Sequence, residues 1–455
     1  MEWLKLLSYQ RIGQVQKDIK SGDIRSEFEK DYDRLIFSHP FRRLQDKTQV
    51  FPLPEDDFVH TRLTHSLEVS SVGRSLGKLA GEQIISANKE LSESGYTKYD
   101  FGTIVASACL AHDLGNPPFG HSGEDAISEF FIKNLESSKI KNSINPKEWS
   151  DLCNFEGNAQ GFRILTKTYQ QGLRLTASTL AAFTKYPRES KIDSIDKTKR
   201  SQKKYGFFQS EKQIFTELAN EVGLNFSGSP LNSEGKADNL IWCRHPLAFL
   251  VEAADDICYH IIDLEDGCRL GLVPFSQAKD LLAEILGDRF DSQKFERTTD
   301  QNEKMELLRA LSINTLVYQA AEVFRQNEKG LLNGTFDTAL TDLLPSKEIL
   351  KEIIRISVDK IYNAKVVVET QAAGFEVIGG LLDIFCEAII EKYHFKQSLS
   401  ARNKNLMRMF PVKFLPAEGA TEYDCILAVI DFVSGMTDSY AISLYRKIKG
   451  MNLPR

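Results

Sequence analysis

Histidine is scarce in this chain, and half of the histidines lie in one stretch. The sequence of 455 residues has eight of them, and four fall between positions 60 and 121. His112 is followed directly by Asp113, and His121 is followed three residues later by Glu124. Imidazole nitrogens and carboxylate oxygens are ligands of first-row divalent metals, and carboxylates also suit Mg²⁺. The pair of His112 and Asp113 is therefore the first candidate for a metal centre.

Two adjacent residues cannot complete such a centre, so other elements must supply further ligands. His65 lies in a segment whose apolar residues recur at helical spacing. Asp255 belongs to an acidic pair inside another apolar helical segment. A buried carboxylate is costly unless a cation or several hydrogen-bond donors satisfy it. We therefore predict that His65 and Asp255 join His112 and Asp113 around one metal ion.

The elements that must position these side chains have helical patterns almost throughout. Segments 101–113 and 246–264 carry apolar residues every three to four positions. Further helices are expected over 346–362, 376–391 and 423–447. The only strand patterns are a short run at 412–415 and a hairpin segment at 207–208. Polar loops are expected over 86–99, 136–150, 187–206 and 225–239.

The composition is that of a folded globular protein without a membrane span. Hydrophobic residues make up 42% of the chain and charged residues 26%, which excludes a disordered or low-complexity protein. No apolar run reaches the ~18–20 residues that a span needs, and the first residues lack a signal-peptide pattern. The seven cysteines form no CxxC pair, so neither a disulfide framework nor a thiolate zinc site is indicated. We therefore expect a cytoplasmic protein that does not engage a membrane.

The overall charge argues against a nucleic-acid-binding protein of the strongly basic kind. The net charge of −6 leaves no global positive field for nucleic acid. Segment 187–206 is a local exception, with seven Lys and Arg residues. It is either a solvated loop or, if it faces a phosphate-bearing ligand, a binding element.

The organisation predicted for the chain is one large all-α body with a small β element. No linker divides the sequence cleanly. We expect a core with insertions over residues 1–300 and a C-terminal helical region over residues 301–455 that packs on this core.

Eight strings of the sequence, in order, resemble one enzyme family. The set of His65, His112, Asp113 and Asp255 looks like the H…HD…D signature of the HD-domain metal-dependent phosphohydrolases. The longer strings are similar to the dGTP triphosphohydrolase branch of that family, and the match runs in register from about 25 to 447. These strings are FRRLQDKTQVFP (41–52), TRLTHSLEV (61–69), AHDLGNPPFGHSGE (111–124), NFEGNAQGFRIL (154–165), LTASTLAAFTKYP (175–187), KYGFFQSE (204–211), EAADDICYHIIDLEDG (252–267) and SGMTDSYA (434–441).

The resemblance implies a fold, a reaction and partners. The fold is the all-α HD-domain helical bundle with family-specific additions, and such enzymes are commonly homo-oligomers, up to a hexamer. The reaction is cleavage of a dNTP, preferably dGTP, between the 5′ oxygen and the α-phosphorus, which releases deoxynucleoside and triphosphate. The implied cofactor is Mg²⁺ or Mn²⁺, which activates a water and stabilises charge on phosphorus. Single-stranded DNA stays a candidate second partner.

The resemblance also implies roles for residues near the metal. The leaving 5′ oxygen needs a proton or a close positive partner, and we assign His121 as the general acid or in-line catalytic residue. Glu124, at i+3 from it, can reach the imidazole and orient it. Arg62, three residues before His65, lies on the helical face of that ligand and is expected to bind the phosphates. Lys185 and the basic segment 187–206 are weaker candidates for the same role.

Sugar and base are expected to meet two other sets of residues. Asp255, Tyr259 and Asp263 are spaced i, i+4 and i+8, so they project from one stripe of a helix. The matching residues of the family contact the 3′-hydroxyl, and the tyrosine ring leaves no room for a 2′-hydroxyl. Gln49 and Val50 align with the family's base-contacting positions, and a glutamine offers both a donor and an acceptor.

Two departures from the family pattern affect the proton transfer. Asn116 and Asn158 stand where some relatives carry a histidine, which places more of this work on His121. Two other interpretations stay open: an HD phosphodiesterase acting on another nucleotide, and a nucleotide or nucleic-acid sensor in which the HD site is only structural. Product analysis separates them, because only the first hypothesis predicts released triphosphate.

Overall fold

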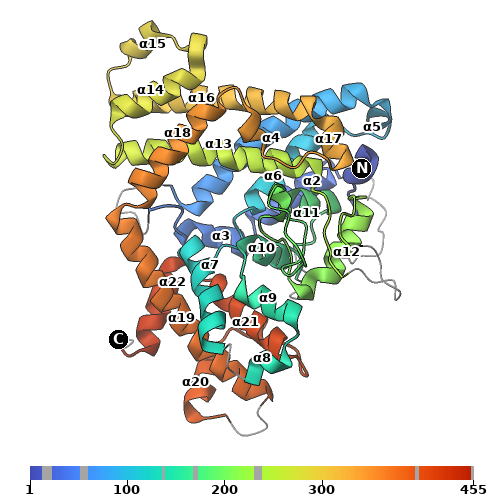
Figure 1. Cartoon of the computed structure of the whole chain (residues 1–455), viewed down its shortest axis with the longest axis vertical. Helices are drawn as coiled ribbons and strands as arrows, with labels where there is room; N and C mark the ends of the chain where they lie inside the picture. Colours follow the sequence, from blue (N-terminus) through green and yellow to red (C-terminus); the bar gives the residue numbers. More distant parts are fainter. Residues whose placement is uncertain are drawn as a thin grey trace.

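A computed structural model describes residues 1–12, 23–51, 60–135, 139–167, 173–229, 238–394 and 399–451. The described chain is all-α, as predicted (Figure 1). The expected small β element is reduced, in these ranges, to isolated bridges that form no sheet. One of them pairs Thr48 with Thr61, directly before the longest N-terminal helix.

The helices lie in two groups, which occupy the upper and lower parts of Figure 1. The helices up to the middle of the chain are α1 (Trp3–Leu6), α2 (Glu27–Ile36), α3 (His39–Arg43), α4 (Arg62–Ala87), α5 (Lys89–Glu93), α6 (Lys98–Ala111), α7 (His121–Phe130), α8 (Lys139–Ser143), α9 (Pro146–Cys153), α10 (Gly157–Thr166), α11 (Ala177–Phe183) and α12 (Lys212–Glu221). They are followed by α13 (Pro246–Arg269), α14 (Phe275–Leu286), α15 (Ser292–Arg297), α16 (Gln301–Gln326), α17 (Glu328–Asn333), α18 (Lys347–Ile356), α19 (Lys365–His394), α20 (Ala401–Met409), α21 (Glu422–Ser434) and α22 (Asp438–Ile448).

Glycines on α4 allow its close approach to α6. Gly73, Gly77 and Gly81 lie on one face of α4, since they are four residues apart. A Cβ atom on Gly77 would lie 2.6 Å from the carbonyl oxygen of Phe101, and one on Gly73 would lie 2.5 Å from Sγ of Cys109. Side chains at these positions would therefore push the helices apart. The contact brings the start of α4 beside the end of α6, where the predicted ligands lie.

Two hydrophobic cores follow the two groups of helices. The first contains buried residues of α4, α6, α13 and α16. The second contains buried residues of α7, α19, α21 and α22. The residues between α6 and α7 connect the two, so the chain around His112 to His121 lies at their junction. The domain boundary near residue 300 stays a prediction.

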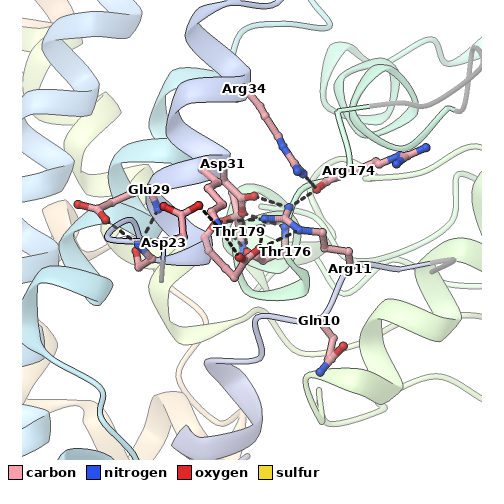
Figure 2. Close-up of polar contacts among 12 residues, drawn as sticks. Gln10, Arg11, Asp23, Glu29, Asp31, Arg34, Arg174, Thr176 and Thr179 are labelled. Carbon is pink, nitrogen blue, oxygen red and sulfur yellow. Dashed lines mark hydrogen bonds and ion pairs between the residues drawn. The ribbon is translucent and has the colours of Figure 1, made fainter. Parts of the chain in front are cut away.

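A buried carboxylate ties the N-terminal segment to the first core (Figure 2). Asp31 of α2 accepts a hydrogen bond of 2.7 Å from Arg11 and bonds from the backbone N–H and the hydroxyl of Thr176. Arg11 and Arg34 both donate to the carbonyl oxygen of Arg174. Because Thr176 caps the N-terminus of α11, these contacts join three segments distant in sequence.

The helix predicted over 423–447 is wrong as a single element. The chain turns by 113° between α21 and α22, because Thr437 caps a new helix by accepting from the N–H of Tyr440. No single helix in the described ranges is long and apolar enough to cross a membrane; α21 and α22 meet that criterion only as a bent pair.

Other elements differ from the sequence expectations in smaller ways. Residues 412–415 form no strand, since Val412–Phe414 is a 3₁₀ turn, and residues 207–208 pair with no strand either. The helix over 346–362 is confirmed, with its last part, Ser357–Tyr362, widened to a π-helix. The predicted loops 86–99 and 136–150 contain the short helices α5, α8 and α9, although residues 136–138 lie outside the described residues. Residues 230–237 of the loop 225–239 also lie outside them.

Candidate active site

Three helical segments bring the predicted metal ligands together. His65 lies in the first turn of α4, and His112 and Asp113 follow the last residue of α6. Ligand atoms of these three buried residues lie within 4.8 Å of one another. From α13, Oδ1 of Asp255 lies 3.2 Å from Nε2 of His65 and 3.4 Å from Nε2 of His112. All four predicted ligands therefore lie in one cluster.

The ring of His112 is held so that one nitrogen faces the carboxylates. Its Nδ1 lies 2.6 Å from the carbonyl oxygen of Cys109, and because a carbonyl only accepts, Nδ1 donates this bond. Its Nε2 is buried and makes no hydrogen bond within the described ranges. In a neutral ring this nitrogen presents a lone pair, with oxygens of Asp113 and Asp255 3.6 and 3.4 Å away. A cation between these acceptors satisfies them all, so the donor set fits a divalent metal ion.

The carboxylates of the cluster are held ionised. Burial alone would raise the pKa of Asp113, but the guanidinium of Arg62 and the nearby histidines outweigh this and hold the pKa well below its usual range. The same opposition holds for Asp255, where Lys185 has the largest lowering effect on the pKa. The ammonium of Lys185 lies 2.6 Å from Oδ2 of Asp255. Ionised carboxylates are the form that binds a metal ion.

A cavity of about 230 Å³ contains most of the predicted substrate residues. Its lining includes Gln49, Val50, Arg62, His121 and Tyr259. These residues come from the segment before α4, from α4 itself, from the start of α7 and from α13. Gln49 and Tyr259, which are 210 residues apart in sequence, thereby line the same cavity next to the metal cluster.

Arg62 links the cavity to the metal cluster. Its side chain is buried, and Nη1 donates a hydrogen bond of 2.8 Å to Oδ2 of Asp113. Nη2 lies so close to Gly120 that a Cβ atom there would be 2.7 Å from it. The guanidinium therefore extends from the metal ligands to the loop that precedes His121.

His121 and Glu124 form the pair that their spacing predicts. Nδ1 of His121 lies 2.7 Å from Oε2 of Glu124, whose other oxygen accepts a bond of 2.7 Å from the N–H of Gly157. The hydrogen bond to Glu124 raises the pKa of His121. The imidazole is 80% exposed while Glu124 is buried, so the carboxylate is fixed and the ring, which lines the cavity, is accessible.

Of the two residues on α13 that were predicted to contact the sugar, Tyr259 lines the cavity and Asp263 does not. Tyr259 lines the cavity, and its ring lies 5.7 Å from the ring of Tyr362 at an interplanar angle of 32°. Asp263 is buried and is not part of the cavity lining. It accepts a hydrogen bond of 2.6 Å from the hydroxyl of Tyr362, and burial raises its pKa to about 8. The carboxylate that was predicted to bind a sugar hydroxyl therefore binds the hydroxyl of Tyr362 instead.

Comparisons with known proteins identify the family of this chain. Residues 345–447 match the family model described as phosphohydrolase-associated domain. The chain is 44% identical to the deoxyguanosinetriphosphate triphosphohydrolase-like protein of Synechocystis sp. and 39% identical to that of Pseudomonas aeruginosa. Each comparison covers the full length of this chain and of the relative. It is 33% identical to the deoxyguanosinetriphosphate triphosphohydrolase of Salmonella typhimurium, over 92% of this chain and 93% of that protein. The chain belongs to the deoxyguanosinetriphosphate triphosphohydrolase family.

The two asparagines that depart from the pattern of this triphosphohydrolase family are both engaged. Nδ2 of Asn116 donates a hydrogen bond of 2.5 Å to Oδ1 of Asp113, so it orients a metal-ligand candidate. Asn158 donates a bond of 2.7 Å to Glu156, which also contacts Lys204. In this family member, neither side chain takes the place of an acid or base.

The basic segment 187–206 lies partly against this site. Lys204 lies 3.0 Å from Glu156 and 3.8 Å from Glu124. Arg200 lies 3.1 Å from Glu252 of α13, whereas Lys191, Lys197 and Lys203 are exposed. The cations of this segment therefore fall into two groups. Some neutralise buried carboxylates, and others face the solvent.

Sequence reasoning missed Tyr362 and Asp438 and undervalued Lys185. Tyr362 ends a helix that reads as an ordinary amphipathic one, so no local signal distinguished its ring from a core aromatic. Lys185 was a weak phosphate-binding candidate, and the structure pairs it with Asp255. Asp438 lies in the string SGMTDSYA, which carried the resemblance but no role.

Proposed function

We propose that this protein hydrolyses deoxynucleoside triphosphates, with dGTP preferred, to deoxynucleoside and inorganic triphosphate. One observation supports this above the others: Arg62 donates to Asp113 of the metal cluster and lines the same cavity as His121 and Tyr259. A phosphate bound there has the cluster on one side and a proton donor on the other. The names of the relatives support the substrate class.

His65, His112, Asp113 and Asp255 would hold the metal ion, which we propose to be Mg²⁺ or Mn²⁺. Bound there, it would lower the pKa of a water and act as a Lewis acid on the α-phosphoryl group. Lys185 holds Asp255 in place through its 2.6 Å contact, and the carbonyl oxygen of Cys109 fixes the ring of His112. These contacts position the ligands without contributing to the ion's coordination.

His121 is the proposed general acid for the 5′ oxygen. The hydrogen bond to Glu124 raises the pKa of His121 and so favours the protonated imidazole, which is the form that a general acid requires. Glu124 accepts from Nδ1, so the proton to be transferred is on Nε2. The bond from Gly157 to Glu124 restricts the carboxylate and hence the orientation of the ring.

The substrate itself is proposed to lie along the cavity. Arg62 binds the phosphates near the metal ion, at the point where its guanidinium lies between Asp113 and Gly120. Tyr259, supported by the ring of Tyr362, excludes a 2′-hydroxyl. Gln49, whose buried Oε1 has no partner within the described residues, offers an acceptor to the base beside Val50.

Asp263 is proposed to act on the sugar through Tyr362. Because it already accepts from the hydroxyl of Tyr362, a direct bond to the 3′-hydroxyl requires that hydroxyl to move. We further propose a cytoplasmic location and a homo-oligomer, with single-stranded DNA as a second partner to be tested.

The decisive experiment is an incubation of the protein with each dNTP and Mg²⁺ or Mn²⁺, followed by chromatography of the products. We expect deoxynucleoside and triphosphate, with the highest kcat/KM for dGTP. Asp113→Asn, which keeps the shape of the side chain, is the matched control for contaminating phosphatases. Orthophosphate, pyrophosphate or a nucleoside monophosphate as the product would contradict the proposal and favour a phosphodiesterase. No turnover of any dNTP by the metal-replete protein would favour a sensor.

A further inference from the structure

One carboxylate of the C-terminal region contacts both sides of the substrate cavity. Asp438 is the first residue of α22, within the phosphohydrolase-associated part of the chain, and its side chain is buried. It does not line the cavity itself. Its two oxygens bind two segments that do, and these segments are 71 residues apart in sequence.

The first segment carries the residues that we place at the base. Oδ2 of Asp438 accepts a hydrogen bond of 3.0 Å from the N–H of Thr48 and one of 2.5 Å from its hydroxyl. Thr48, Gln49 and Val50 are consecutive, and all three line the cavity. The carboxylate therefore anchors the start of this short wall by both its main chain and its side chain.

The second segment is the turn that ends at His121. Oδ1 of Asp438 accepts a hydrogen bond of 3.1 Å from the N–H of Phe119. Phe119 has a φ of 64°, a left-handed conformation that non-glycine residues adopt rarely and at an energetic cost. Its ring packs so closely on α19 that a Cβ atom on Gly374 would lie 2.9 Å from it. The hydrogen bond to Asp438 is one of the contacts that maintain this conformation.

A neighbouring lysine connects the same two regions. Nζ of Lys47 donates to the carbonyl oxygen of Asn116, at 2.5 Å, and to that of Ser434, at 2.8 Å. Asn116 lies earlier in the loop between Asp113 and His121, and Ser434 ends α21. Asn116 is thus connected to the C-terminal region through Lys47, whereas Asp438 contacts the loop directly at Phe119, nearer to His121.

We infer that Asp438 is a positioning residue that sets the distance between the base-contacting segment 48–50 and His121, and so couples base selection to the rate of the chemical step. The inference rests on the proposed function for its kinetic part. A carboxylate suits this role because all its lone pairs accept, and here it receives three donors. Its place in the first turn of α22 favours the negative charge.

The substitution Asp438→Asn tests this with little change in volume. An asparagine has one acceptor oxygen and one NH₂ group, so in either orientation its NH₂ meets an N–H donor of Thr48 or Phe119. We expect kcat for dGTP to fall by roughly 10- to 100-fold, because small displacements of reacting groups have effects of this size. We also expect the kcat/KM ratio between dGTP and the other dNTPs to change by about threefold or more, while metal content by elemental analysis stays that of the wild type.

Hydrogen exchange supplies a readout that is independent of turnover. In Asp438→Asn, backbone exchange in residues 47–50 and 119–121 should be faster, because both segments lose an anchor. The matched control is Asp431→Asn on α21, a buried carboxylate that accepts from Arg163 and Gln160 and does not line the cavity. It should lower the melting temperature while kcat, the dNTP ratio and exchange in both segments stay unchanged.

The outcomes separate the inference from the proposed function. A fall in kcat with an unchanged dNTP ratio, or unchanged exchange in either segment of Asp438→Asn, overturns the coupling. The same changes in Asp431→Asn also overturn it, because they would show a general loss of stability. If the wild-type protein hydrolyses no dNTP, the proposed function fails, while the exchange experiment still decides whether Asp438 holds the two segments together.

Discussion

The hydroxyl of Tyr362 donates a hydrogen bond of 2.6 Å to Asp263, 99 residues away in sequence. This bond places the ring of Tyr362 beside that of Tyr259, with 5.7 Å between the ring centroids. Two aromatic rings, rather than one, therefore form the part of the cavity that we assign to the sugar. Sugar discrimination is accordingly expected to depend on both tyrosines and on the carboxylate that holds the second.

Tyr259→Ala should raise the turnover of GTP relative to dGTP, since the removed ring leaves space beside C2′. The overall efficiency should fall at the same time. Tyr362→Phe is the companion variant. It keeps the ring but removes the hydroxyl that donates to Asp263. It should therefore change kcat/KM for dGTP more than for 2′,3′-dideoxy-GTP, which has no 3′-hydroxyl. The measurement is kcat/KM for all three nucleotides. An unaltered ratio of GTP to dGTP in Tyr259→Ala would return that residue to a packing role.

Asp113→Ala should abolish metal binding and turnover, because a mixed nitrogen and oxygen site loses a hard anionic ligand. The buried guanidinium of Arg62 also loses its partner at 2.8 Å, so the variant should be less stable as well. Elemental analysis of the purified protein measures the first effect and thermal unfolding the second. Wild-type metal content in this variant would refute the ligand assignment.

His121→Ala should retain the metal and the substrate affinity but lose roughly 10²–10⁴ in rate, the usual size of general acid–base assistance. If the variant instead loses its metal, His121 is a ligand.

Glu124→Gln tests the same role through pH. The hydrogen bond that His121 donates to Glu124 raises the pKa of His121. A general acid works only while it is protonated, so the rate falls as pH rises through that pKa. Removing the charge of Glu124 lowers this pKa and should move the alkaline limb of the kcat profile to lower pH. An alkaline limb at the wild-type position would show that His121 is not the acid.

His60→Gln should destabilise the protein in a pH-dependent manner. Burial alone would lower the pKa of His60, but hydrogen bonds to Asp266 and Glu68 outweigh it and raise the pKa to about 10. A raised pKa means that the folded state binds the proton more tightly, so this stabilisation is complete below the ordinary pKa of ~6.5 and is lost as pH rises towards 10. The difference in unfolding free energy between wild type and variant should be roughly 1.5–3 kcal/mol near neutral pH, and it should shrink as pH rises. A difference that does not vary between pH 7 and 10 would argue against a charged His60.

The sequence by itself was sufficient for the features that depend on local spacing. The pair of His112 and Asp113, the i, i+3 pair of His121 and Glu124, and the stripe on α13 are contained in single helices or turns. A helix has a constant rise and rotation per residue, so the relative directions of such side chains follow from their separation alone. The all-α class follows from the same periodicity.

The break between α21 and α22 shows where periodicity misleads. Apolar residues continue at helical spacing through 423–447, but the chain turns by 113° before Asp438. That turn is what allows Asp438 to reach Phe119 and Thr48. A hydrophobic pattern records which residues are buried, not whether the axis that carries them is straight.

Only the tertiary structure decided which distant residues meet. Lys185 pairs with Asp255, Tyr362 with Asp263, and Asp438 with Phe119, across 70, 99 and 319 residues. Each contact depends on how helices approach and cross, which is determined by packing over many side chains and by glycines such as Gly77 that permit close approach. No spacing along the chain encodes such a contact, because the energy that selects it belongs to the packed core as a whole and not to either partner.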